Sequence, residues 1–171
     1  MQPDEKRELI EYLTAGERAL MDALEGVTEE LAQRAEDGRW SILQCVEHLA
    51  LAEDHLFGRI LAATPTGAPV VNERRERLIR ERGPSRSRPV AAPDVAAPHA
   101  HYATLAEALE AFSAARARTV AFVESCNADL RAQVTTHPVV PGPVNCHEML
   151  LFIAVHPLRH ASQIQEIRAG Q

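Results

Sequence analysis

Residues 145–168 read NCHEMLLFIAVHPLRHASQIQEIR, and this stretch does most to set the expected fold. Asn145 is followed three positions later by Glu148, a pair that is typical of a helix start. Apolar residues then recur at helical spacing, and Gly170 follows as a stop signal. The stretch therefore predicts a helix over residues 145–168 that carries His156 and His160 on one face, one turn apart.

Both histidines share the apolar stripe of this helix with Met149, Ile153 and Ile164. Two imidazoles on a buried face need partners, because an unpaired buried polar group is costly. They are either two hydrogen-bonded core histidines or two ligands of one metal ion, which the spacing of four residues allows. We favour the metal site, which a third imidazole from another helix would complete while leaving an open position.

Three further helices are predicted from apolar spacing, over residues 4–25, 41–63 and 104–125. The second and third of these begin with the pattern of a capping box, in which two side chains satisfy each other's free backbone N–H groups. These pairs are Ser41 with Gln44 and Thr104 with Glu107.

Residues 64–103 link the second and third predicted helices and are rich in proline. They predict a mostly irregular connection with one short helix over residues 71–82. The basic residues between Arg74 and Arg88 alternate with glutamates, and we favour a solvated segment over the alternative of an anion-binding site. No part of the chain alternates with the period of a strand, so a single all-α domain over residues 1–171 is expected.

The lengths of the links indicate a four-helix bundle with a crossover in the middle. His48 lies about 7 residues from the start of its helix and His160 about 8 from the end of its own, which places each roughly 10–12 Å from a helix end. In an up-down-down-up bundle these helices are antiparallel, and both histidines lie at one level. In an up-down-up-down bundle they would differ in height by about 12 Å, and no single ion could join them. The sequence therefore predicts the up-down-down-up topology, with His48 as the third ligand.

Several other residues have alternative roles near such a site. Cys45 lies one turn before His48 and is a candidate fourth ligand, although small buried cysteines are common in cores. His55 is too far along the helix for the same ion and could line the mouth of a pocket. Arg159 could hold a substrate carboxylate or pair with an acidic neighbour, and we favour the pairing. The remaining candidates are expected outside the site: Trp40 packed at the helix entry, His99, His101 and His137 exposed, and His147 on the far side of its helix.

The segment from His156 to His160 differs from the HExxH motif of zinc peptidases, in which a glutamate next to the first histidine is the general base. Pro157 occupies that place, so peptide hydrolysis by that mechanism is not expected. Pro157 also removes the backbone hydrogen bond to the Ile153 carbonyl, which should kink the helix between the two histidines.

The composition is ordinary for a soluble globular protein, with 46% apolar and 25% charged residues. The net charge of −6 argues against nucleic acid or an anionic membrane as the main partner. We expect no membrane span and no signal peptide, because long apolar runs are lacking and the N-terminal residues are charged. Three widely spaced cysteines are expected to be reduced thiols of a cytoplasmic protein: Cys45, Cys126 and Cys146.

Two motifs, taken together, resemble one known family. Trp40-Ser41-x-x-Gln44-x-x-x-His48-Leu49 resembles the second-helix signature of the DinB-like (DinB/YfiT) metalloprotein superfamily. His156-x-x-Arg159-His160-x-x-Gln163-Ile164 resembles its fourth-helix signature. The resemblance spans nearly the whole chain, although Pro157 and the proline-rich middle segment are not part of the pattern. It implies an up-down-down-up bundle, often a homodimer, with a divalent metal held by His48, His156 and His160.

The resemblance also implies a chemistry, because some relatives are transferases or isomerases that use low-molecular-weight thiols. Three neutral imidazoles leave a bound ion a charge near +2, which lowers the pKa of a bound thiol or water. Three hypotheses follow: a metal-dependent thiol S-transferase acting on a small electrophile, a non-catalytic metal-binding stress or structural protein, and a metal-dependent hydrolase. Zinc, nickel and iron all suit such ligands. The run from Met149 to Val155, apolar all round its helix, further predicts a homodimer.

Overall fold

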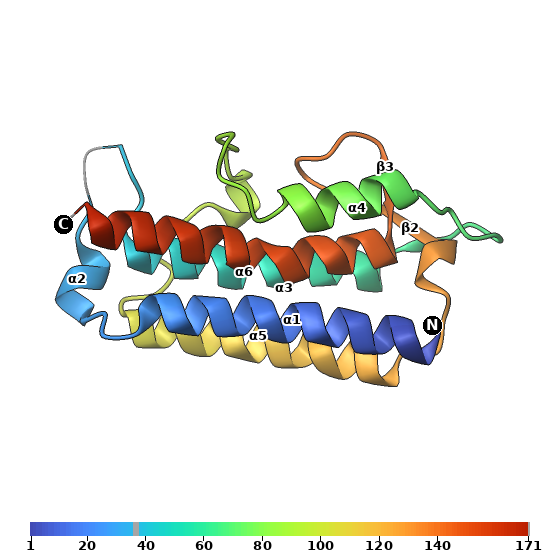
Figure 1. Ribbon diagram of the computed structural model, residues 1–171, viewed down its shortest axis with the longest axis horizontal. Coiled ribbons are helices and arrows are strands. Elements are labelled where there is room, and N and C mark those ends of the chain that lie inside the picture. Colours follow the sequence, from blue (N-terminus) through green and yellow to red (C-terminus); the bar gives the residue numbers. More distant parts are fainter. Residues whose placement is uncertain (36–37, 171) are drawn as a thin grey trace.

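The computed structural model describes residues 1–35 and 38–170. Four long helices lie side by side: α1 (Pro3–Leu24), α3 (Ile42–Leu61), α5 (Leu105–Ser125) and α6 (Cys146–Ala169) (Figure 1). α1 and α6 run in one direction, and α3 and α5 run in the other. The predicted up-down-down-up four-helix bundle is therefore confirmed, and α3 and α6 are antiparallel.

Polar caps determine where these helices begin. The Ser41 hydroxyl accepts from the Gln44 N–H at 3.1 Å, and the Gln44 side chain accepts from the Ser41 N–H at 2.9 Å. A similar reciprocal pair begins α6. The Thr104 hydroxyl caps α5, but the Glu107 carboxylate accepts from the Ala103 N–H and not from that of Thr104. The capping box predicted at Thr104 is therefore only half formed.

The links between the long helices carry short elements. The predicted short helix in the crossover is confirmed as α4 (Glu73–Arg82). The sequence predicted no strands, yet three antiparallel strands of two to four residues pair in the order β1-β2-β3. They are too short to show a periodic pattern. The remaining elements are α2 (Glu29–Gln33), β1 (Thr64–Pro65), η1 (Asp94–Ala96), η2 (Leu130–Ala132), β2 (Gln133–Thr136) and β3 (Pro143–Asn145).

α4 packs on α6, and three basic residues of the crossover are not the solvated side chains that the sequence predicted. Arg75 lies 2.7 Å from the buried carboxylate of Glu148. Arg80 pairs with a glutamate of α1 at 3.0 Å, and Arg86 pairs with Glu166 at 2.9 Å. The prediction was wrong for these residues because their acidic partners lie on other helices, which local charge alternation does not reveal.

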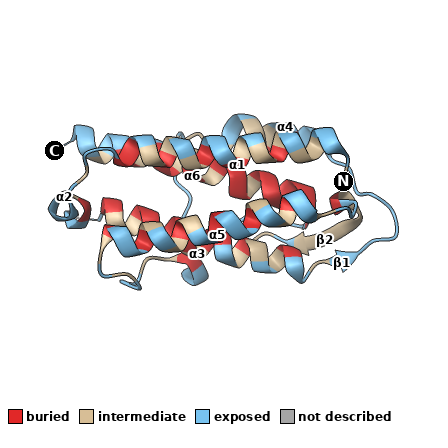
Figure 2. Cartoon of the chain, turned by 90° about the horizontal axis from the view of Figure 1, so that it is seen from below, coloured by how far each residue is buried: buried red, intermediate tan, exposed pale blue. Residues whose placement is uncertain are grey.

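Buried residues line the faces that the helices turn toward one another (Figure 2). Two apolar clusters fill the two ends of the bundle, and the buried Glu53 and Arg116 lie between them. α1, α3 and α4 all pack on α6. This central position accounts for the apolar run from Met149 to Val155 within one chain, so the run is no argument for a homodimer. Within the described residues, no helix is long and apolar enough to cross a membrane.

Candidate metal centre

His48 lies two turns into α3, where the cap at Ser41 sets the start of the helix. Its side chain is buried, and Nδ1 lies 2.7 Å from the carbonyl oxygen of Ala96 in η1. Nδ1 therefore donates its proton to this carbonyl. Because a neutral imidazole carries a single N–H, the bond leaves a lone pair on Nε2. The crossover thus fixes the form of His48 that can bind a metal.

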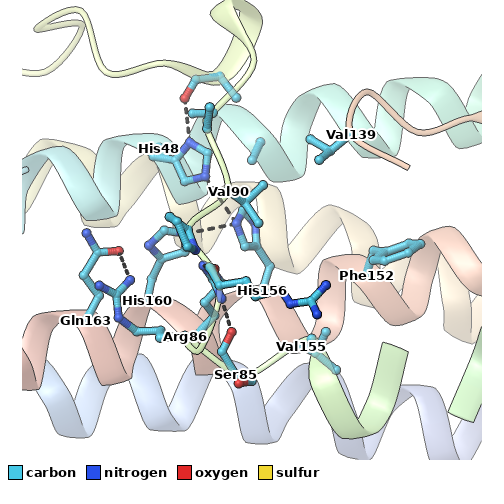
Figure 3. Close-up of a pocket in the computed structure, with 18 of the residues that line it drawn as sticks. His48, Ser85, Arg86, Val90, Val139, Phe152, Val155, His156, His160 and Gln163 are labelled. Atoms are coloured by element: carbon cyan, nitrogen blue, oxygen red, sulfur yellow. Dashed lines mark hydrogen bonds between the residues drawn. The ribbon is translucent and has the colours of Figure 1, made fainter. Parts of the chain in front are cut away.

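His156 and His160 bring two more nitrogens to the same point from α6 (Figure 3). The Nε2 atom of His156 lies 3.2 Å from Nε2 of His48 and 3.0 Å from Nε2 of His160. One ring nitrogen of each histidine lies within 4.8 Å of those of the other two. Over residues 1–35 and 38–170, no other group of three potential ligands is so closely spaced. The structure therefore brings together all three predicted ligands.

This arrangement suits a divalent ion better than a set of core histidines. With metal–nitrogen bonds of about 2.0–2.1 Å and tetrahedral angles, two ligand nitrogens lie about 3.3 Å apart. The separations of 3.2 and 3.0 Å in the structure are close to this value. Without an ion, His48 Nε2 has no proton to donate, and His156 Nε2 has at most one N–H for two nitrogen neighbours. A cation satisfies all three lone pairs at once.

Burial keeps these imidazoles neutral. It lowers the pKa of His48, and the hydrogen bond to Ala96 only partly opposes this effect. The pKa values of His156 and His160 are held well below their usual range, first by burial and then by the other histidines. Neutral imidazole is the form that ligates metal, so the site needs little proton release on binding.

Trp40 is a part of the site that the sequence did not reveal. The sequence predicted that Trp40 packs at the helix entry, and it does pack against the apolar cluster that includes Ile42 and Cys45. Its ring also lies 4.9 Å from that of His48 and stacks on that of His160 at 6.2 Å. Its position before the cap of α3 signals a helix entry only, because the contact with His160 depends on how α3 and α6 pack. The indole shields two of the three imidazoles from one side.

Cys45 is not part of the three-histidine group. Its side chain is fully buried, and this burial raises the pKa of the thiol to about 12. A thiol must lose its proton to bind a metal, so the structure favours the alternative that Cys45 packs in the core.

A cavity of about 1030 Å³ opens beside the three histidines. α3 and α6 contribute His48, His156 and His160, while residues 81–93 of the crossover and residues 137–140 form other parts of its wall. His55 lines this cavity, a role that the sequence had left open for it. The proline-rich crossover therefore has a clear place: it encloses the space in front of the candidate ligands.

The other histidines fall partly where they were expected. His99 and His101 are exposed, but the prediction was wrong for His137, which is half-buried and lines the cavity. Its Nδ1 accepts two backbone N–H groups, each at 3.2 Å. Burial, helped by His55, lowers the pKa of His137 to about 4. His147 is buried away from the cavity, with Nε2 3.6 Å from a carboxylate oxygen of Glu76.

α6 continues through Pro157, and the spacing of His156 and His160 is kept. The carbonyl oxygen of Ile153, which Pro157 leaves without its helical donor, lies 3.4 Å from Nη2 of the buried Arg116. Arg159 also differs from expectation, because it donates to the carbonyl oxygens of Ser85 and Arg88 and not to an acidic side chain.

Comparison with known proteins agrees with this fold. No curated protein matches the chain. Among solved structures, the chain is similar to YfiT from Bacillus subtilis, described as "a probable metal-dependent hydrolase with an unusual four-helix bundle topology". The TM-score is 0.60 at 19% identity, over 99% of this chain and 90% of that one, which shows the shared fold alone. The family model of the DinB superfamily matches residues 12–164, which is most of the chain. This protein therefore belongs to the DinB superfamily.

Proposed function

We propose that this protein binds a divalent metal ion through His48, His156 and His160 and transfers a small thiol to an electrophile. The observation that carries the proposal is the convergence of three Nε2 atoms at the wall of a cavity of about 1030 Å³. Structural zinc sites are closed by four protein ligands, whereas catalytic sites keep a position open. Three ligands beside a large cavity support a catalytic site over a purely structural one.

A divalent ion held by three neutral imidazoles lowers the pKa of a thiol or water that it binds, which supplies a nucleophile near neutral pH. Zinc, nickel or iron would suit these ligands. In the proposed reaction the thiol proton passes to solvent and the sulfur forms a bond to the electrophilic carbon. The leaving group departs with the electron pair of the bond that breaks.

The residues of the chain prepare the site for this chemistry. The carbonyl of Ala96 fixes the proton of His48 on Nδ1, and the ring of Trp40 packs beside the imidazoles of His48 and His160. Glu166 is the cavity carboxylate nearest in sequence to the ligands, and Arg86 already binds both of its oxygens. It is therefore a poor general base, which supports a nucleophile formed without help from a side chain.

A metal-dependent hydrolase is the second candidate. The description of YfiT as a probable metal-dependent hydrolase favours it, because that protein has the same fold. A hydrolase would use the same ligands with water as the nucleophile and would need no added thiol.

The test is a screen of the zinc-loaded protein with small electrophiles, with and without thiols, beside His160→Ala. We expect products only with the thiol present, and none from the variant. Products without a thiol, at a rate that rises with a pKa near 7, would favour the hydrolase. Stoichiometric metal without turnover in any assay would contradict catalysis and leave metal binding as the function.

A further inference from the structure

Positive charge gathers around the cavity of an otherwise acidic protein. The chain carries a net charge of −6. Arg39 apart, the cavity lining includes four arginines, Arg82, Arg86, Arg88 and Arg159, against two glutamates. A cleft lined by one sign of charge focuses the field and concentrates ions of the opposite sign. The lining therefore favours an anionic ligand.

Arg86 is the arginine best placed to bind such an anion beside the candidate ligands (Figure 3). Its Nε lies 3.0 and 2.9 Å from the two carboxylate oxygens of Glu166, and Nη1 lies 2.8 Å from the side-chain oxygen of Gln163. Both acceptors follow His160 on α6, within two turns. Nη2 has no hydrogen-bond partner among the described residues, so a fixed guanidinium still has donors for a ligand in the cavity.

Arg86 and Arg159 both line the cavity, and only Arg86 forms an ion pair with Glu166. Arg159 precedes His160 and donates to two carbonyl oxygens of the crossover, those of Ser85 and Arg88. Across the described part of the chain, Arg159 forms no ion pair. Arg86 and Arg159 together carry two positive charges close to the three histidines, and Glu166 is the acidic side chain beside both of them.

Apolar side chains form another part of the lining. Val90, Val139, Phe152 and Val155 all line the cavity (Figure 3). Val90 and Val139 are 56% and 44% exposed, which leaves apolar surface uncovered at the cavity. A ligand with an apolar body would cover this surface and gain from its removal from water.

We propose that the substrate of the metal site is a small organic carboxylate, whose anionic group binds Arg86 and whose apolar body lies against Val139, Phe152 and Val155. This inference rests on the proposed function, because it takes the three histidines as the reacting centre. A carboxylate suits the planar fork of a guanidinium, and an apolar body suits the valines and Phe152.

The test is calorimetric binding of 2-naphthoate and of the neutral 2-naphthamide to the zinc-loaded protein. Arg86→Gln removes the anion-binding donors. Arg77→Gln is the matched control, since Arg77 is an exposed arginine of α4 outside the cavity. We expect Arg86→Gln to weaken naphthoate binding about tenfold or more and Arg77→Gln to change it less than about twofold. Naphthamide binding should be insensitive to both.

Glu166→Gln separates recognition from a merely structural role. If Arg86 binds the carboxylate, loss of the competing charge of Glu166 should tighten naphthoate binding. If Arg86 only fastens the crossover to α6, both Glu166→Gln and Arg86→Gln should weaken binding of naphthoate and naphthamide alike, which would overturn the inference. Absence of naphthoate binding to wild type would overturn it too. Failure of the wild type to take up zinc would instead contradict the proposed function. In that case the binding of naphthoate and naphthamide to wild type and the variants would be compared in the metal-free protein.

Discussion

Arg116 joins three other helices through a single buried guanidinium group. It lies 2.8 Å from the carbonyl oxygen of Leu13 in α1, 2.8 Å from the Glu53 carboxylate in α3 and 3.4 Å from the carbonyl oxygen of Ile153 in α6. Its side chain and that of Glu53 are almost entirely buried. The guanidinium therefore joins the two helices that carry the candidate ligands. It also donates to the carbonyl oxygen of Ile153, which has no helical donor because of Pro157.

Arg116→Met should destabilise the protein by about 3–5 kcal/mol, because it leaves the Glu53 carboxylate buried without a counter-charge. Urea unfolding monitored by circular dichroism measures the change. Arg116→Met combined with Glu53→Leu should recover much of the loss, since replacing both members of a buried pair with apolar groups is often neutral. A double variant that is less stable than Arg116→Met would contradict this account.

For single residues, the sequence predicted those neighbours in the candidate site that follow from spacing along a helix. The separation of His156 and His160 along one helix predicted that they lie side by side. The distance of His48 from the end of its own helix predicted that it lies at the same height. The contact of Trp40 with His160 could not be predicted, because it depends on the packing of α3 against α6. The role of Arg116 was hidden for the same reason, since its partners come from three distant segments.

Among the elements, α1 and α6 approach each other closely at Gly16. A Cβ atom on Gly16 would lie 2.4 Å from the carbonyl oxygen of Ala154 and 3.6 Å from Cδ of Pro157. The first distance is far too short for a carbon–oxygen contact, and the obstacle is backbone that cannot rotate away. Glycine therefore allows α1 to pack directly on the segment of α6 that precedes His156.

Gly16→Ala should push α1 away from α6 and destabilise the fold by about 1–3 kcal/mol, as overpacking does elsewhere. Gly58→Ala is the control, because Gly58 is an exposed helical glycine of α3 with nothing within 4 Å of its added Cβ. It should stabilise the fold by about 0.5–1 kcal/mol. Thermal and urea unfolding measure the change in stability of each variant, which should be negative for Gly16→Ala and positive for Gly58→Ala. Equal changes in the two variants would contradict the close approach of α1 and α6.

The long helices could be predicted because each carries its own apolar stripe and its own cap. The small sheet could not, because β1 pairs with β2 across about seventy residues and each strand is very short. The sequence predicted a mostly irregular crossover, and this is correct outside its short elements. Its contacts with α6, however, are made through Arg75, Arg86 and Arg159. The alternation of basic and acidic residues along the crossover gives no information on partners that lie on another helix.

In the whole molecule, a polar network joins α1, α4, η2 and α6 at the end of the bundle that holds the sheet. Nε of Arg131 lies 2.9 Å from the buried Glu76, and Arg131 also pairs with Glu5. Burial acts to raise the pKa of Glu76, but the hydrogen bonds of Arg131 and the neighbouring positive charges outweigh it and lower the pKa. Burial also acts to raise the pKa of Glu5, but the hydrogen bonds from the Gln2 N–H and from Arg131 outweigh it and lower the pKa.

A carboxylate whose pKa is lower in the folded state stabilises the fold above its unfolded pKa of about 4.3, and this contribution is lost as the pH falls through the folded pKa. Glu76→Gln should therefore cost about 2 kcal/mol at pH 7, and its difference from wild type should shrink below about pH 4. Urea unfolding from pH 7 to pH 3 measures this. Glu8→Gln removes a more exposed ion pair to Arg80 and should cost less than about 1 kcal/mol at any pH. A Glu76→Gln difference that is constant with pH would contradict the assignment.

The central claim is that one metal ion binds where α3 and α6 present three imidazoles, and elemental mass spectrometry of purified, zinc-equilibrated protein tests it most directly. We expect about one zinc per chain in wild type, little or none in His48→Ala, His156→Ala and His160→Ala, and full occupancy in His55→Ala, whose imidazole lines the cavity outside the group. Each variant should remain folded by circular dichroism. A wild type that binds no zinc or nickel, or a His160→Ala variant that keeps full occupancy, would contradict the account.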